Sequence, residues 1–300
     1  MGRPRDVGGR PDGAVARRVP RAFRGRRASV SGRLRAERVA LAAVGAVLVA
    51  FLAVPILALF ATATAGDVAQ GLRHPLVWPA LRLSLLTTSA SLAVVVVLGT
   101  PLAWTLARSR GRLSRAVEAV VQLPIVVPPA VAGVALLLAF GRRGLLSGWL
   151  YPAGWSVSFT TTAVVVAEVF VSAPFFVQAA TSAFRRVDAR LLVVARTFGA
   201  SPLRVFFRVA LPLSAPGLAA GAAMSWARSL GEFGATLMFA GNLEGRTQTL
   251  PLAIYTALES ELRAAQALSM VLVVVAFTLL LFVRAVLRRS TEAERPEAAP

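Results

Sequence analysis

Six long apolar stretches dominate this chain and constrain what it can fold into. Because an α-helix rises about 1.5 Å per residue, about 20 apolar residues cross the roughly 30 Å hydrocarbon core of a bilayer. A hydrophobic content of 56% and a mean hydropathy of +0.68 suit a surface in contact with lipid. We predict an all-α integral membrane protein with about six transmembrane helices, near residues 39–61, 83–107, 119–140, 161–180, 213–235 and 267–286.

The positions of these stretches predict the organisation of the chain. Residues 1–38 are rich in Arg, Gly and Pro and have little apolar periodicity, so we expect a disordered cytoplasmic arm. Residues 39–61 form the first transmembrane helix, and residues 81–286 form a core with the other five. Residues 287–300 are expected to be a cytoplasmic tail.

The basic residues indicate the orientation of the chain in the membrane. The sequence contains no lysine, so its 33 basic residues are all arginine. With both termini placed in the cytoplasm, 26 arginines lie in cytoplasmic segments, six lie in outer loops, and Arg228 lies within a span. Cytoplasmic loops of membrane proteins carry such an excess of basic residues. We therefore predict a multi-pass protein of the cell (plasma) membrane with both termini cytoplasmic.

The net charge of +19 would also be compatible with nucleic-acid binding. Here, however, the arginines flank apolar stretches instead of clustering on a soluble domain. We attribute the charge to membrane topology and to attraction by anionic lipid headgroups. Membrane lipids are therefore expected partners, and nucleic acid is not.

The residue inventory argues against chemistry in this chain. It has no cysteine and a single histidine, His74, so thiolate and histidine-rich metal sites are excluded. A Walker A phosphate loop needs a lysine, which the sequence lacks. We expect no catalytic residue, no metal and no cofactor bound by this chain. Any ATP and Mg²⁺ must be bound by a partner subunit.

Prolines interrupt two of the apolar stretches. Pro124, Pro128 and Pro129 lie in the third stretch and Pro174 lies in the fourth, and each removes an amide donor and bends a helix. Lipid does not tolerate the carbonyls that a bend frees, whereas a protein-lined pathway does. Pro128 and Pro129 are therefore candidates for a translocation pathway. A bend that serves packing alone remains an equal alternative.

The segment 187–212 is long for a link between two membrane helices and contains its own helix signals. A short amphipathic helix is expected over residues 191–198, ended by Gly199 in the left-handed conformation. Ser201 then caps a second helix whose first position is Pro202. Two short helices that meet at such a turn predict a rigid cytoplasmic protrusion.

This segment resembles the coupling loop of permeases from binding-protein-dependent ABC importers. Their pattern is Glu-Ala-Ala, three residues, Gly, nine residues, then Ile-x-Leu-Pro. The spacing matches from Ala195 through Gly199 to Pro212, although residues 193 and 194 are both valine. In that family the loop docks on an ATPase subunit. The alternative for this segment is an ordinary amphipathic loop at the membrane interface. The resemblance implies a coupling surface made of Ala195, Gly199, Ala200, Ser201, Pro202 and Arg204.

Polar residues recur at three- and four-residue steps in the fifth apolar stretch. Arg228 lies about 24 Å along a helix from Pro212, too deep to belong to a loop. An ionisable residue at that depth faces a bundle interior or an aqueous path, so a pathway and an ion pair that fixes helix packing both remain open. Glu168 in the fourth stretch has the same ambiguity. Five residues would share one face of a continuous helix as pathway candidates: Ser225, Arg228, Ser229, Glu232 and Thr236.

The sequence that follows resembles the molybdate permease (ModB) type, within the molybdate, tungstate and sulfate permease family. The matching residues are Gly231–Thr236, Ala240–Asn242 and Thr247–Tyr255, and the whole resemblance covers about residues 81–286. It implies the type I permease fold of ABC importers with a cytoplasmic coupling helix. It also implies a homodimer with the pathway at its interface, an ABC ATPase subunit and an extracytoplasmic oxyanion-binding protein.

The function expected from this resemblance is ATP-driven import of molybdate. The same machinery importing tungstate or sulfate is one alternative, and a passive anion channel is an alternative of a different class. A passive channel would not need the protrusion around Gly199. An intramembrane enzyme is disfavoured by the residue inventory. The candidates for docking of the binding protein are Asn242, Arg246, Gln248 and Tyr255.

Overall fold

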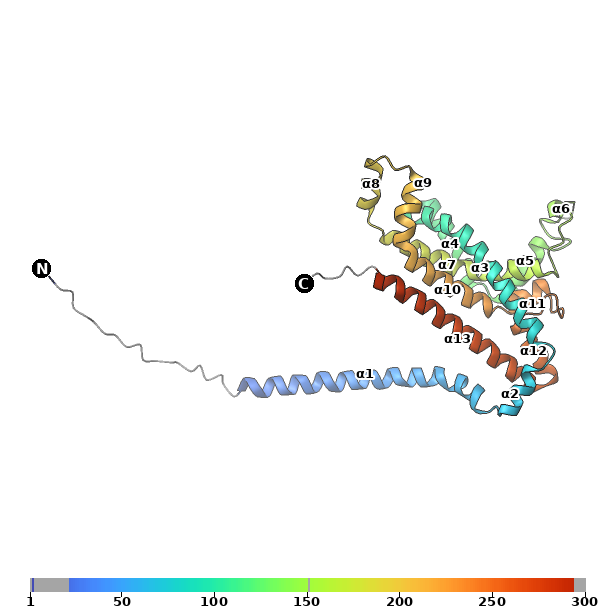
Figure 1. Ribbon diagram of the computed structural model, residues 1–300, viewed down its shortest axis with the longest axis horizontal. Helices are drawn as coiled ribbons and strands as arrows, with labels where there is room; N and C mark the ends of the chain where they lie inside the picture. The colour runs from blue at the N-terminus through green and yellow to red at the C-terminus, as the bar shows by residue number, and fades with distance from the viewer. Residues whose placement is uncertain (1, 3–21, 151, 294–300) are drawn as a thin grey trace. The chain divides into compact units, whose positions relative to one another are not determined.

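A computed structural model describes residues 2, 22–150 and 152–293 of the chain. All regular structure in these residues is helical (Figure 1). Five helical segments are long and apolar enough to cross a membrane, and a sharply bent pair of helices raises the number to six. The predicted all-α membrane fold with about six spans is therefore confirmed. The chain forms two compact units, residues 1–58 and 59–300.

The first unit contains most of the helix α1 (Ala22–Ala61). Its span, Leu41–Ala61, has a mean hydropathy of 2.7, and none of it is buried. Apolar side chains all round a helix suit contact with lipid. The helix begins at Ala22, within the predicted disordered arm, and residues 22–38 contain no proline that would interrupt it. Residues 3–21 of that predicted arm lie outside the described residues.

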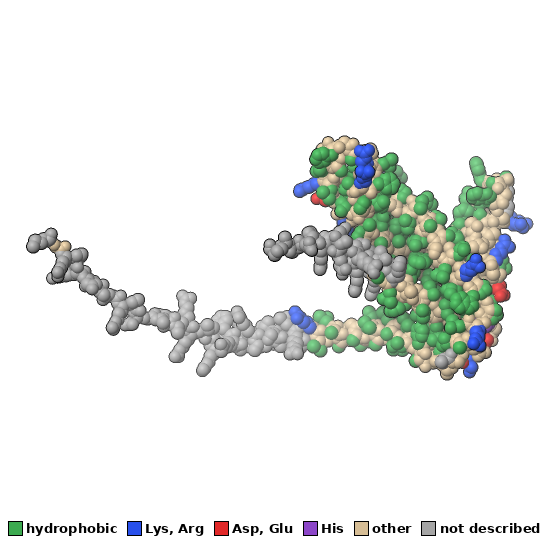
Figure 2. Space-filling view, viewed as in Figure 1, with side chains coloured by type: hydrophobic (Ala, Val, Ile, Leu, Met, Phe, Trp, Pro, Cys, Tyr) green, Lys and Arg blue, Asp and Glu red, His purple; other side chains and the backbone are tan. Residues whose placement is uncertain are grey.

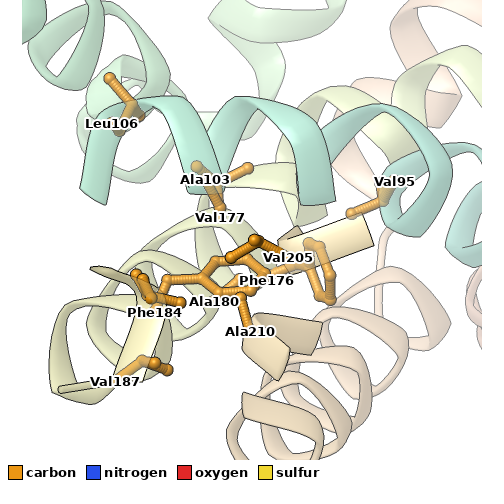
Figure 3. Packing of buried hydrophobic residues seen from close by; sticks show 11 residues of the cluster. Val95, Ala103, Leu106, Phe176, Val177, Ala180, Phe184, Val187, Val205 and Ala210 are labelled. Carbon is orange, nitrogen blue, oxygen red and sulfur yellow. The ribbon is translucent and has the colours of Figure 1, made fainter. Parts of the chain in front are cut away.

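The core of the second unit is built around a central membrane helix, α7 (Thr161–Arg186). It packs against both α3 (Val77–Arg108) and α10 (Leu211–Leu230). Figure 3 shows Phe176 and Phe184 of α7 among small side chains such as Ala103 and Ala210, and both rings are fully buried. The four long helices of this unit are α3 (Val77–Arg108), α7 (Thr161–Arg186), α10 (Leu211–Leu230) and α13 (Leu262–Ala293).

Two glycines allow α10 to approach α7 closely. A Cβ atom built on Gly217 would lie 2.5 Å from the Cβ of Ala183, and one built on Gly221 would lie 2.8 Å from the Cβ of Ala179. Real side chains never approach so closely, so the contact requires glycine. Small residues at helix interfaces let backbones meet in this way in membrane proteins, where packing drives association.

The third span is broken at its prolines. The chain bends by 118° between the helices α4 (Arg112–Val126) and α5 (Pro129–Phe140), so the predicted bend is confirmed and is much sharper than a kink. A residue before proline is driven into the extended region, and two such residues follow each other here. Val127 and Pro128 have ψ angles of 127° and 139°, which no α-helix can continue.

The fifth span is also broken, and here the sequence prediction of one helix over residues 213–235 is wrong. The helix α10 ends at Leu230, and a separate helix, α11 (Gly234–Ala240), follows. The Glu232 carboxylate accepts a 2.8 Å hydrogen bond from the Ala235 amide, one of the first amides of α11, which have no carbonyl partner within the helix. A Cβ on Gly234 would lie 2.8 Å from the Cβ of Pro129, so α11 packs directly on α5.

Three shorter helices complete the described part of the chain outside the loop between α7 and α10. Thr64 and Asp67 form a reciprocal capping box at the start of the first of them, α2. The last helix, α13, extends to Ala293 and so includes part of the predicted tail, whose residues 294–300 lie outside the described residues. The sequence prediction did not include these short helices, which are α2 (Ala65–Leu72), α6 (Ser147–Leu150) and α12 (Leu250–Ser260).

Candidate coupling loop and membrane pathway

The loop between α7 and α10 begins with α8 (Ala189–Thr197). The Asp188 carboxylate accepts a 2.8 Å hydrogen bond from the Arg190 amide and caps this helix. The helix ends at Thr197, and Gly199, two residues later, has a φ of 79° in the left-handed region. The predicted glycine turn is therefore confirmed, and the helix starts two residues before its predicted beginning.

A second helix, α9 (Pro202–Val205), starts directly after the turn. The Ser201 hydroxyl accepts a 3.3 Å hydrogen bond from the Arg204 amide, and Pro202 occupies the first helical position. The predicted cap and proline position are both confirmed. The geometry of the turn is therefore specified locally by the residues that form it.

The second helix is not a separate short helix as predicted, because it continues into α10. A π-helical segment, η1 (Phe206–Ala210), joins α9 to α10, and the Leu211 amide donates to the carbonyl five residues back at Phe206. The ring of Pro212 clashes with the carbonyl of residue 208 in a regular helix, and a π-turn accommodates it. Residues 202–230 therefore form one continuous helical run.

The base of the loop is packed firmly against the membrane helices. Leu192 and Val205 are buried in the same cluster as Phe184. The ring of Trp104 on α3 lies 5.3 Å from the rings of both Phe184 and Phe206, edge to face. Because both arms of the loop are anchored, the turn between them is held in a fixed position.

The tip of the loop is exposed and partly apolar. Of the predicted coupling residues, Gly199, Ser201, Pro202 and Arg204 are exposed, whereas Ala195 and Ala200 are half-buried and pack on the cluster below. Arginine side chains also lie on this tip (Figure 2). The prediction missed two large exposed side chains, Phe198 and Leu203, which are 87% and 71% exposed. Their position beside the glycine turn is the signal that could have identified them.

The predicted pathway residues of the fifth span lie mostly in the interior of the folded chain. Arg228 and Glu232 form the predicted ion pair, with 2.8 Å between nitrogen and oxygen, and Glu232 also caps α11. The Ser225 hydroxyl donates to the Ser172 carbonyl of α7 at 3.1 Å. These contacts favour a structural role. Four of the five residues are 0–3% exposed, namely Ser225, Ser229, Glu232 and Thr236.

The two predicted pathway prolines have a different environment. Pro128 and Pro129 are exposed at the break between α4 and α5. A pathway between two copies of a protomer must be lined by residues that each protomer exposes. Among the predicted pathway residues, the two prolines and the partly exposed Arg228 meet that condition.

The four predicted docking residues divide into exposed and inward-facing side chains. Arg246 and Tyr255 are exposed, and a hydrogen bond with Glu259 raises the pKa of the Tyr255 phenol. Asn242 and Gln248 instead donate to the hydroxyl of Thr256, at 2.8 and 3.2 Å. Since Gln248 is only 5% exposed, it fixes the loop between α11 and α12 from within.

The family described as binding-protein-dependent transport system inner membrane component matches residues 96–292. The chain belongs to this family. The match includes the loop between α7 and α10 and all the residues predicted for coupling, pathway and docking. The family resemblance predicted from the sequence is confirmed.

Relatives within this family of inner membrane components are named as permeases. The molybdenum transport system permease protein ModB of Mycobacterium tuberculosis is 52% identical over 206 residues, which are 69% of this chain and 78% of that protein. The molybdate/tungstate transport system permease protein WtpB of Pyrococcus abyssi is 40% identical over 202 residues, which are 66% of this chain and 76% of that protein.

Solved structures of ABC transporters share the fold of this inner membrane component. A bacterial ABC transporter involved in the import of alginate matches with a TM-score of 0.68 and 16% identity, over 87% of this chain and 99% of that one. The MetNI methionine ABC transporter, in an inward-facing conformation, matches with a TM-score of 0.58 and 20% identity, over 72% of this chain and 96% of that one. The predicted ABC importer permease fold is confirmed.

Proposed function

We propose that this chain is the permease subunit of an ATP-driven, binding-protein-dependent importer of molybdate. The observation that carries the mechanism is the anchored turn at Gly199 and Ser201, which exposes a partly apolar tip in a fixed position. The support for molybdate is the 52% identity to a permease named for molybdenum transport. The chain supplies a pathway and a coupling device, and a separate ATPase subunit supplies ATP hydrolysis.

The continuous helical run explains how a force at the tip could reach the membrane interior. Residues 202–230 comprise 29 residues, or about 44 Å of helix. A displacement at Ser201 moves the far end of this rod, where Arg228 is paired with Glu232. Because Glu232 also caps α11, and α11 packs on α5, the movement would reach the broken third span.

The assembly that suits this mechanism is a homodimer. Two copies would form the pathway at their interface, with an ABC ATPase below the coupling loops and an oxyanion-binding protein on the opposite side. In the proposed orientation, both termini and the tip of the loop are cytoplasmic. The excess of arginine in the segments on that side supports this orientation.

Tungstate is the second candidate substrate. The relative from Pyrococcus abyssi is named for both oxyanions, and it is 40% identical to this chain. Sulfate, another tetrahedral oxyanion, is a third candidate, and a passive anion channel is a candidate of a different class. The channel would conduct without an ATPase and would make no use of the exposed tip.

Reconstitution tests the proposal directly. The permease would be placed in proteoliposomes with its cognate ATPase and binding protein, and uptake of labelled molybdate would be measured with and without ATP. We expect ATP-dependent uptake that tungstate competes for more effectively than sulfate. Uptake that persists with an inactive ATPase would support the channel instead. If none of the three oxyanions competes, the substrate assignment is wrong.

A further inference from the structure

A polar face on α7 lies close to the coupling loop and is not explained by the residues discussed above. Its members recur at steps of three and four residues over the last two turns of the helix, so they lie on one side. Gln178 and Ser182 are exposed near the end of α7 that we predict to be cytoplasmic. The polar face consists of Gln178, Thr181, Ser182 and Arg185.

The helix α4 completes a small cavity opposite this polar face. Glu118 and Gln122, one turn apart on α4, line the cavity together with all four residues of the polar face. Arg185 forms an ion pair with Glu118 across it. The cavity volume of about 60 Å³ exceeds the roughly 10–15 Å³ that one water needs, so it has room for several oxygen-sized groups.

Two observations indicate that the cavity receives a polar occupant. The Thr181 hydroxyl is buried, with the residue 5% exposed, and has no hydrogen-bond partner among the described residues. The exposed residues Gln122 and Gln178 also line the cavity and add two amide groups to its lining. A buried polar group without a hydrogen-bond partner is costly and is normally satisfied by water or by a polar ligand.

The chemistry of these side chains favours an anion. Arginine offers a planar fork of donors, two amide groups offer N–H donors, and two hydroxyls complete the set. We propose that the cavity is a transient binding site for the transported tetrahedral oxyanion, on the part of the pathway next to the coupling loop. This inference rests on the proposed function.

Glu118 gives the site the weak affinity that a transport pathway requires. When the cavity is empty, its carboxylate neutralises Arg185. An arriving oxyanion must displace that carboxylate, and the carboxylate returns as the anion leaves. Binding along a pathway must be favourable enough for entry and weak enough for exit.

The chain has no cysteine of its own, so one introduced cysteine provides a unique thiol. Its labelling tests whether the polar face is accessible to water and whether the anion binds there. Ser182→Cys would be assembled with the ATPase and the binding protein in proteoliposomes and treated with a charged thiol reagent. We expect labelling, and about tenfold protection by molybdate at roughly ten times its Kd. Val97→Cys, on an apolar exposed position of α3, should remain unlabelled.

A second variant measures transport through the site. Gln178→Leu should reduce molybdate uptake per ATP hydrolysed several-fold, while ATP hydrolysis stimulated by the binding protein stays near the wild-type rate. Gln70→Leu makes the same chemical change at an exposed residue of α2 and should leave uptake unchanged. The ratio separates a pathway defect from a folding defect, because misfolded protein loses both activities.

The outcomes distinguish this inference from the proposed function. If Ser182→Cys is not labelled, or is labelled equally fast with and without molybdate, the site is overturned while wild-type uptake still supports the importer. Normal uptake per ATP by Gln178→Leu would also overturn it. If the wild-type assembly imports no oxyanion, the proposed function itself fails.

Discussion

Glu168 on α7 accepts a 2.8 Å hydrogen bond from the hydroxyl of Thr87 on α3, 81 residues earlier in the chain. Both residues are buried, with exposed fractions of 2% and 0%. The second carboxylate oxygen of Glu168 has no partner among the described residues. The contact joins α3 to α7 inside the buried core, so this carboxyl group contributes to the packing of the two helices.

Thr87→Val should therefore destabilise the protein more than its small change in shape suggests. The variant keeps the volume but leaves the Glu168 oxygen buried without its donor, which costs about 1–3 kcal/mol. We expect a lower melting temperature in detergent, with membrane insertion retained. Thr105→Val is the matched control, because Thr105 is exposed and bonds only within its own helix. Equal melting temperatures for the two variants would show that the contact contributes nothing.

Glu232→Ala should lower stability rather than block an open pathway. The change removes the partner of Arg228 and the acceptor for the Ala235 amide. Since Arg228 retains partial access to solvent, we expect a loss on the order of 1–3 kcal/mol. Glu232→Gln retains an acceptor for the amide and should lose less. Thermal unfolding and protein abundance would be compared with uptake per folded molecule, and a selective loss of uptake would instead place Glu232 in the pathway.

The sequence predicts the membrane spans well because length and hydrophobicity decide them. It predicts the turn at Gly199 and Ser201 equally well, because a left-handed glycine and a serine cap act within a few residues. It fails at the break after Leu230, where the three- and four-residue spacing of polar residues continues across the break as it would in a single helix. The contact of Gly234 with Pro129, 105 positions earlier, marks the break, and no local pattern reveals it.

The same limit explains which polar residues were chosen as pathway candidates. Helical spacing shows that Ser225 and Glu232 could share a face, but it does not show which neighbour covers that face. In the structure both are buried within the protomer. The spacing of Gln178 and Arg185 on α7 was equally visible in the sequence, and these two residues are exposed. Exposure depends on tertiary packing and is not predictable from periodicity alone.

Gly71→Ala should disrupt the packing of α2 on α13. A Cβ at this position would lie 2.1 Å from the Cβ of Ala267, so one helix must move. Overpacking of this kind costs about 1–3 kcal/mol. Gly66→Ala is a matched control in the same helix, where the nearest atom would lie at an ordinary 3.7 Å from the new methyl group. Replacing glycine in a helix stabilises by about 0.5–1 kcal/mol, so the two variants should move the melting temperature in opposite directions. A shift of the same sign would contradict the close contact.

Gly199→Glu should leave a folded, inserted protein that no longer couples ATP hydrolysis to uptake. The substitution places a charged side chain in the left-handed turn at the exposed tip, where no atom lies within 4 Å of a new Cβ. Residual strain in that conformation costs about 1–2 kcal/mol, too little to unfold the anchored loop. The effect on coupling would come from the charge that the tip then presents to the ATPase.

Gly154→Glu separates the effect of the charge on coupling from the effect of backbone strain. Gly154 has a φ of 77°, also has no atom within 4 Å of a new Cβ, and lies in the loop between α6 and α7. The backbone strain from a non-glycine residue at positive φ is therefore similar in the two variants, and only Gly199→Glu alters the proposed coupling surface. Copurification with the ATPase and ATP-dependent uptake should fall for Gly199→Glu and stay near wild type for Gly154→Glu. A parallel loss in both variants would attribute the effect of Gly199→Glu to strain instead of lost coupling. Normal ATP-dependent uptake by Gly199→Glu would contradict the coupling role of the turn.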